Sequence, residues 1–207
     1  MSMRVTEASN YTEYRNSIAF EYINFFEILG FMVILIPNNT QGIKQYFSLG
    51  IDLIVLSGGN NVNPKLYNNN NTLNDVYAVR DNLEKQLLEY AITNSIKTIG
   101  ICRGMHFINI FFNGTLSHNI KNHVNTQHFL KSDLDILDNK ETNSYHNQGI
   151  KTKNLANKFN ILAITEDEIV EAILNDNKTI LAIQWHPERQ KKEYDKKLII
   201  NFIKGIL

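Results

Sequence analysis

The segment Gly100-Ile101-Cys102-Arg103-Gly104-Met105 places the only cysteine of the chain between two glycines. Residues 97–101 form a short apolar, β-branched run typical of a buried strand, and residues 107–112 are typical of a buried helix. Cys102 therefore lies at a predicted strand-to-helix turn, where small neighbours tolerate a sharp bend and helix amides favour the thiolate. The pattern predicts a nucleophile, although a single cysteine is more often a small buried hydrophobe.

A second segment, Gln184-Trp185-His186-Pro187-Glu188, follows an apolar run at 179–183 that predicts another strand. Its histidine and glutamate are two residues apart, with a proline between them that stiffens the spacing. Such a pair supplies a base for a thiol and a carboxylate that orients the base. A His-Pro-Glu sequence by itself is most often an ordinary loop, so the hypothesis depends on both segments together.

The rest of the chain alternates between the two kinds of element. Predicted strands cover residues 4–6, 31–36, 51–56, 97–101 and 179–184, and predicted helices cover 18–29, 42–49, 80–94, 107–112 and 196–206. This order predicts an α/β fold with a mostly parallel open sheet flanked by helices, and the short strand-like pieces in 126–173 predict a small antiparallel excursion. Ligands bind beyond the carboxyl ends of such strands, where Gly58-Gly59, Cys102 and His186 all fall.

Length and charge limit the classes of function. The 207 residues, 43% of them hydrophobic, suffice for one domain spanning 1–207. Lys plus Arg and Asp plus Glu both number 21, so no dominant field favours nucleic acid or a membrane surface as a partner. No apolar run approaches the roughly 20 residues that span a bilayer. A lone thiol suits a reducing compartment, and we expect a cytoplasmic protein.

The two segments together resemble the class I glutamine amidotransferase superfamily. Further motifs resemble its γ-glutamyl hydrolase branch: Ser57-Gly58-Gly59-Asn60-Asn61-Val62-Asn63-Pro64, Arg80-Asp81 with Glu84, Asn113-Gly114-Thr115-Leu116 and Asn143-Ser144-Tyr145-His146-Asn147-Gln148. The likeness covers nearly the whole chain and implies a flavodoxin-like sheet. It also implies a catalytic triad of Cys102, His186 and Glu188, an oxyanion hole made by the backbone N–H groups of Gly59 and Arg103, and no metal or organic cofactor.

The resemblance also implies the substrate contacts: Gly58, Asn60, His106, Ser144, Tyr145 and His146. His106 stands where the superfamily usually has glutamine, and it either holds the glutamyl group differently or fills space in the helix. Asn61 stands where the branch commonly has aspartate, and the loss of that negative charge favours an anionic leaving group.

The implied reaction is hydrolysis of a γ-glutamyl amide through a thioester on Cys102. Within that branch the chain resembles hydrolases of γ-glutamyl-CDP-amidate, which implies a nucleotide-linked small molecule as substrate. Two other activities stay open: hydrolysis of γ-glutamyl-γ-aminobutyrate, and glutaminase activity that supplies ammonia to a separate synthase. A regulatory binder on the same fold is a third class, which the presence of Cys102, His186 and Glu188 disfavours.

Three histidines, His118, His123 and His128, recur at intervals of five. That interval matches neither one face of a helix nor the usual zinc spacings, and no second cysteine is present. The sequence therefore predicts no metal site.

Overall fold

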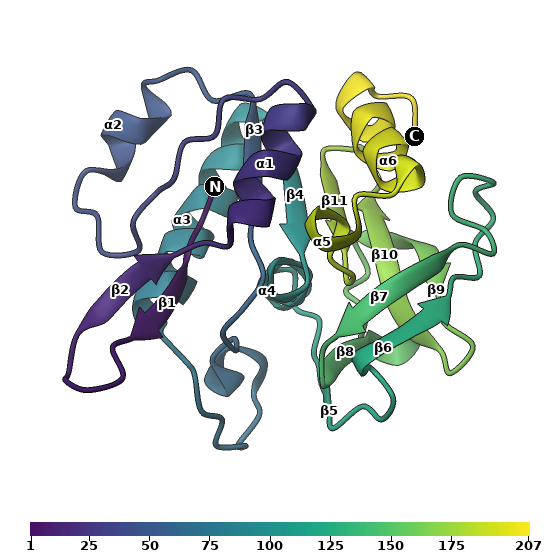
Figure 1. Cartoon of the computed structure of the whole chain (residues 1–207), viewed down its shortest axis with the longest axis horizontal. Coiled ribbons are helices and arrows are strands. Elements are labelled where there is room, and N and C mark those ends of the chain that lie inside the picture. The colour runs from purple at the N-terminus through teal and green to yellow at the C-terminus, as the bar shows by residue number, and fades with distance from the viewer.

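The centre of the molecule is a seven-stranded sheet with the order β3-β4-β11-β10-β8-β5, in which β9 also pairs with β10. The computed structural model describes all residues, 1–207. Three neighbouring strands are parallel: β3 (Leu53–Leu56), β4 (Lys97–Ile101) and β11 (Ile180–Ile183). Their carboxyl ends lie at one edge of the sheet, near the start of α4 (Figure 1).

The other four strands are antiparallel. They are β5 (Ser117–His118), β8 (Gln148–Lys151), β9 (Phe159–Ile164) and β10 (Ile169–Asn175). β10 pairs antiparallel with β11 and so joins the two halves. The α/β architecture and the antiparallel part in 126–173 are confirmed, but the sheet is mixed rather than mostly parallel.

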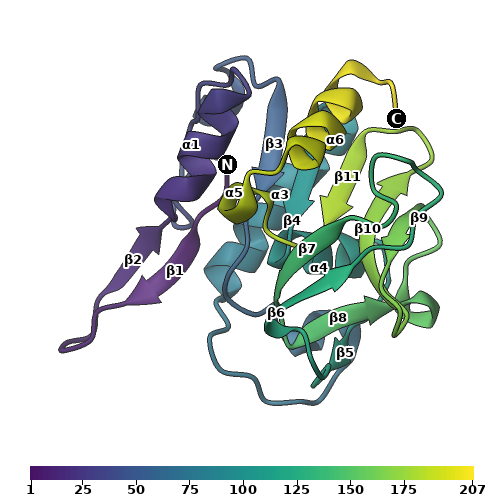
Figure 2. The ribbon, with the colours of Figure 1, turned by 45° about the vertical axis from the view of Figure 1, so that its right-hand side comes forward.

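Helices cover both faces of the parallel half (Figure 2). α3 (Ala78–Asn94) and α4 (Arg103–Phe111) pack with Ile54 and Leu56 in one apolar cluster. α1 (Phe20–Ile28) and α6 (Glu193–Lys204) pack with Val55 in another, on the opposite face. Successive strand residues point to opposite faces, so the apolar run of β3 contributes to both layers.

Two hairpins lie outside the main sheet. β1 (Arg4–Glu7) pairs with β2 (Tyr14–Ser17), and β6 (Val124–Phe129) pairs with β7 (Glu141–Tyr145). Both views place the β6–β7 hairpin over the antiparallel half of the sheet (Figures 1 and 2). The remaining elements are short helices: α2 (Ile43–Phe47), α5 (Pro187–Gln190), η1 (Pro64–Tyr67) and η2 (Thr152–Asn154).

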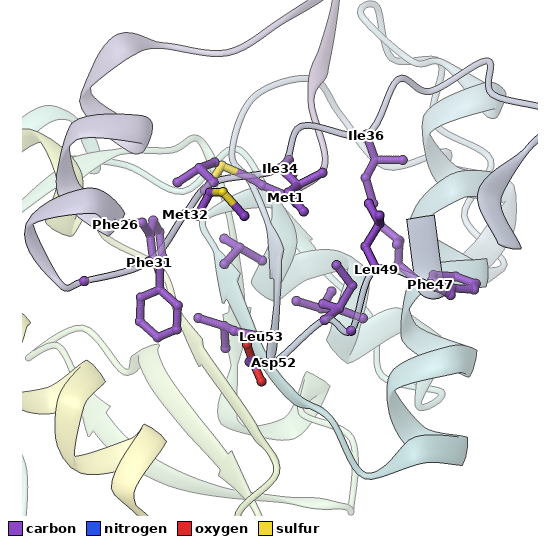
Figure 3. Close-up of a pocket in the computed structure, with 17 residues that line it drawn as sticks. Met1, Phe26, Phe31, Met32, Ile34, Ile36, Phe47, Leu49, Asp52 and Leu53 are labelled. Carbon is purple, nitrogen blue, oxygen red and sulfur yellow. The ribbon is translucent and has the colours of Figure 1, made fainter. Parts of the chain in front are cut away.

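The strand predicted for residues 31–36 does not form. Its only ladder contact is a parallel bridge between Ile36 and Ser2, at the edge beyond β3. Its side chains instead line an apolar cavity of about 320 Å³ together with Met1, Phe47 and Leu53 (Figure 3). The prediction of a buried strand was therefore wrong on both counts: only Ile36 of the run is buried, Met32 is exposed, and no continuous partner pairs with it.

No helix of the structure combines the length and apolar character needed to cross a bilayer.

Candidate active site

Cys102 lies between β4 and α4 in a backbone conformation that L-residues rarely adopt, with φ +53° and ψ −103°. Its N–H donates to the carbonyl of Ile183 on β11 at 2.8 Å. A Cβ on Gly104 would lie 2.1 Å from the carbonyl oxygen of Leu56, so no larger residue fits after the turn. The sharp, strained turn predicted from the flanking glycines is present, and surrounding contacts hold it.

His186 follows β11 and is buried beside the cysteine. Its Nδ1 lies 2.6 Å from Oε1 of Glu188, and since a carboxylate only accepts, Nδ1–H is the donor. A Cβ built on Gly58 would lie 2.9 Å from the His186 ring and 3.4 Å from Cβ of Cys102. The ends of β3, β4 and β11 therefore meet at one point, as expected for a cleft at the carboxyl edge of the sheet.

The thiol and the imidazole shift each other's protonation. Burial raises the pKa of Cys102, but the charge and hydrogen bond of His186 outweigh it, and the pKa falls below its ordinary value. Burial lowers the pKa of His186, yet Cys102 and Glu188 raise it to about 9. Each group favours the charged form of the other, which is the arrangement of a thiolate–imidazolium pair.

Alkylation of the thiol tests this pairing. An ordinary thiol loses reactivity tenfold for each pH unit below about 8.5, whereas the thiolate of Cys102 is expected to react with iodoacetamide at a nearly constant rate well below that pH. Because Cys102 is the only cysteine, the urea-unfolded chain is an internal control. His186→Gln is expected to move the midpoint of the rate profile upward, and an unchanged midpoint would contradict the pairing.

Arg80 of α3 holds the loop after β3 in place, and its side chain is fully buried. Its guanidinium donates to the carbonyl oxygens of Ser57, Gly58 and Gly59 at 2.7, 3.0 and 2.5 Å. In a planar trans peptide the C=O and the following N–H point in opposite directions, so the N–H of Gly59 faces away from Arg80.

The N–H groups of Gly59 and Arg103, beside the cysteine, have no acceptor within the protein. The N–H of Gly58 is already taken, because it donates to the hydroxyl of Tyr22 at 2.9 Å. Both free donors border the same pocket as Cys102. They can therefore receive an oxygen of a bound molecule.

The side chain of Arg103 turns away from that pocket into a buried group of charges. It donates to Glu84 and, at 2.5 Å, to Asp81, both on α3. Glu84 also accepts from Arg80 at 3.0 Å. One buried network of two arginines and two carboxylates thus supports both the Gly58-Gly59 loop and the turn at Cys102.

The pocket over Cys102 has a volume of about 350 Å³ and a mostly polar lining. Of the predicted site residues, it brings together Cys102, His186, Gly59, Asn60, Arg103, His106, Tyr145 and His146. Glu188 lies behind His186, and Gly58 packs between His186 and Cys102.

Ser144 does not reach the pocket, contrary to the prediction. It is buried, and its hydroxyl donates to the carbonyl of His123 at 2.7 Å. Neighbouring residues of a strand point to opposite sides, so Tyr145 faces the pocket and Ser144 faces the sheet.

Asn60 and His106 border the pocket with their polar atoms engaged. Asn60 has φ +58° and its amide bonds to both backbone groups of Val5. Nε2 of His106 lies 2.8 Å from Oε1 of Gln184. Burial lowers the pKa of His106 to about 3, so the imidazole is neutral and supplies no charge to a ligand.

Two residues of the site, Tyr22 and Arg4, escaped the sequence analysis. Tyr22 bonds Gly58, and Arg4 borders the pocket with a side chain more than two-fifths exposed. Arg189, a basic residue that directly follows Glu188 in the sequence, also borders the pocket and is exposed to a similar extent. Arg80, which the sequence analysis named in a motif with Asp81 and Glu84, is a buried support of the Gly58-Gly59 loop. No local signal marked Tyr22 or Arg4, since tertiary contacts alone place them.

A second cluster of titratable groups lies beside the pocket. His123, His128 and His146 surround Glu171 of β10, with nitrogen-to-oxygen distances of 3.9, 3.5 and 3.4 Å. Of the histidines at intervals of five, which the sequence analysis did not take as a metal site, His123 and His128 lie in this cluster, whereas His118 lies elsewhere, 3.1 Å from the hydroxyl of Tyr67.

The family model described as peptidase C26 matches residues 1–139 and 123–188 of the chain. The chain therefore belongs to the peptidase C26 family of glutamine amidotransferase-like proteins. It is 34% identical to the glutamine amidotransferase-like protein YvdE of Lactococcus lactis, over 90% of this chain and 87% of that protein.

Two further relatives bear on the fold and the branch. A γ-glutamyl-CDP-amidate hydrolase of Campylobacter jejuni is 30% identical over 146 residues, which cover 70% of this chain and 66% of that protein. A solved structure from Thermoplasma acidophilum, assigned to GMP synthase, superposes with a TM-score of 0.66 at 22% identity, over 90% of this chain and 86% of that one. The superposition supports the fold.

Proposed function

We propose that this protein hydrolyses a γ-glutamyl amide through a glutamyl thioester on Cys102. The observation that carries the proposal is the line from Cys102 through His186 to Glu188, opposite two N–H groups that have no acceptor in the protein. A nucleophile, a base, an orienting carboxylate and an oxyanion site are the parts that acyl transfer needs.

Acylation begins with attack of the Cys102 thiolate on the γ-carbonyl carbon. The N–H groups of Gly59 and Arg103 stabilise the negative charge that develops on the carbonyl oxygen. His186 gives its proton to the nitrogen as the C–N bond breaks, and the amine or phosphoramidate leaves. Glu188 keeps Nδ1 protonated, so that Nε2 is the atom that exchanges the proton.

Deacylation repeats these steps with water. His186, now neutral, takes a proton from water as the oxygen attacks the thioester carbon. The same two N–H groups hold the second oxyanion. Its collapse breaks the C–S bond, which releases glutamate and regenerates the thiolate beside the imidazolium.

For the leaving group we propose a nucleotide diphosphate linkage, most specifically that of γ-glutamyl-CDP-amidate. Two arginines support it, because Arg4 and Arg189 border the pocket and are partly exposed, where a diphosphate outside the acyl site would reach them. Asn61 adds no negative charge at the same mouth, and the carboxylate that is present there, Asp75, pairs with Arg4 at 3.9 Å. The name of the Campylobacter jejuni relative agrees with this chemistry.

The test is glutamate release from γ-glutamyl-CDP-amidate, γ-glutamyl-γ-aminobutyrate and glutamine, assayed in parallel. Preference for the nucleotide substrate supports the proposal. Preference for the aminobutyrate conjugate would keep the chemistry and overturn the leaving group. Activity on glutamine that rises only with an added synthase would favour a glutaminase that serves a separate synthase.

Arg189→Gln should raise KM for the nucleotide substrate about tenfold, because loss of one charged contact costs about 1.4 kcal/mol. Its KM for γ-glutamyl-γ-aminobutyrate should stay within twofold of wild type. Lys191→Gln is the matched control, since Lys191 is exposed nearby but does not border the pocket. Equal KM changes in both variants, or for both substrates, would contradict a phosphate contact by Arg189.

A further inference from the structure

Glu171 of β10 is a carboxylate in an unusual position. It is fully buried, and neither of its oxygens has a hydrogen-bond partner. A buried carboxylate left in this way carries a large desolvation cost unless a cation compensates it. No lysine or arginine forms an ion pair with it; the groups that face it are three imidazoles.

The three histidines come from one hairpin and present nitrogens rather than ring carbons to this carboxylate. His123 precedes β6, His128 lies on β6, and His146 follows β7. Nε2 of His128 and Nε2 of His146 are buried and make no hydrogen bond. The candidate ligand atoms of His123, His146 and Glu171 all lie within 4.8 Å of one another.

Two of the rings are oriented by bonds on their far side. Nδ1 of His146 lies 2.8 Å from the carbonyl oxygen of Gln148, so Nδ1 carries a proton, and the neutral ring has its lone pair on Nε2. Nε2 of His123 lies 3.0 Å from Oδ2 of Asp167, which likewise leaves the lone pair on Nδ1. A histidine that donates its other N–H to a carbonyl or carboxylate is the usual arrangement of a metal ligand.

We propose that His123, His146 and Glu171 bind one divalent transition-metal ion, with Zn²⁺ the preferred ion, and that His128, which faces the same oxygen of Glu171, joins them when the ion is bound. Ligand atoms of a tetrahedral zinc site with bonds of about 2.0–2.1 Å lie about 3.4 Å apart. The nitrogens of His128 and His146 lie 3.5 and 3.4 Å from Oε1 of Glu171, and that of His123 lies 3.9 Å away. Three imidazoles and one carboxylate favour zinc and its neighbours over calcium or magnesium, which prefer oxygen.

The ion would join the β6–β7 hairpin to β10 of the main sheet. Both views show the hairpin lying over this part of the sheet (Figures 1 and 2). Tyr145 and His146 at the end of the hairpin border the pocket over Cys102. The site therefore acts as a structural clamp on one wall of that pocket.

The test is metal binding by the untagged full chain, after treatment with a chelator and dialysis. Isothermal titration with Zn²⁺ should give one site per chain, and Co²⁺ should give the visible bands of a tetrahedral centre with nitrogen and oxygen ligands. His128→Ala and Glu171→Gln should weaken Zn²⁺ binding at least a hundredfold. Asp167→Asn, which only orients His123, should weaken it about 10- to 100-fold.

Two control variants distinguish this zinc site from zinc binding elsewhere on the protein. His118→Ala removes a histidine outside the cluster, and Cys102→Ala removes the only thiol; both variants should bind Zn²⁺ like wild type. Unfolding temperatures without metal show whether each variant folds. Absence of stoichiometric binding in wild type, or binding lost in Cys102→Ala but kept in His128→Ala, would overturn the proposal.

Discussion

Cys102→Ala is expected to lower kcat for glutamate release by about 10⁴-fold or more, whichever γ-glutamyl substrate proves best. The reason is chemical, since no other side chain of the pocket can form a thioester, and water is a far weaker nucleophile than a thiolate. The alanine leaves the backbone of the turn intact. Substrate binding should therefore remain, with a dissociation constant within a few-fold of the wild-type value.

Trapping the acyl group distinguishes loss of the nucleophile from loss of structure. With hydroxylamine present, wild type should yield γ-glutamyl hydroxamate at the expense of glutamate, whereas Cys102→Ala should yield neither. Circular dichroism and the unfolding midpoint provide the check on folding. A folded Cys102→Ala variant with more than about one hundredth of wild-type kcat would exclude the thioester mechanism.

The centre of the site was predictable because its information is local. A cysteine between glycines at a strand-to-helix junction specifies the turn, and a Cβ on Gly104 has no room beside Leu56. His186 and Glu188 are two residues apart, so one short segment places both. Each of these segments ends a parallel strand, and the topology of the sheet brings the strand ends together.

The supporting residues were not predictable, because contacts distant in sequence place them. The sequence around Arg80 is that of an exposed helix position. Arg80 becomes buried only because α3 packs under the Gly58-Gly59 loop. Glu171 is one polar residue in a strand, and only the hairpin fold surrounds it with histidines. Ser144 illustrates a further difficulty: a shift of one residue along a strand moves a side chain to the opposite face of the sheet.

The difference between local sequence information and contacts distant in sequence also explains why the extent of the antiparallel part was not predicted. Short strands in 126–173 were recognisable from composition, but their pairing with β10 depends on turns and register. β10 is buried along its whole length, so its sequence carries no alternation that shows which neighbours it takes. The parallel strands are separated by helices, so fewer strand pairings were compatible with the sequence.

Glu84→Gln is expected to destabilise the fold by about 3–5 kcal/mol, because it leaves buried guanidinium charge without its partner. Glu84 holds Arg80 and Arg103 at once, and it accepts from the hydroxyl of Ser2 at 2.9 Å. The measurement is the free energy of unfolding from urea denaturation. Glu89→Gln is the matched control on the same helix: Glu89 is exposed and pairs with Lys85 at 3.8 Å, so its loss should cost less than about 0.5 kcal/mol.

The buried charges around Glu84 also link the stability of the fold to the proposed reaction at Cys102. Arg80 fixes the peptide that presents the N–H of Gly59, and Arg103 anchors the residue that presents the second N–H. If the network positions both donors, Glu84→Gln should lower kcat by about tenfold or more even at temperatures where the variant is fully folded, while KM changes little. A folded variant that loses stability but keeps its full kcat would show that the charges support the fold alone, and that the two backbone turns hold the proposed oxyanion site without them.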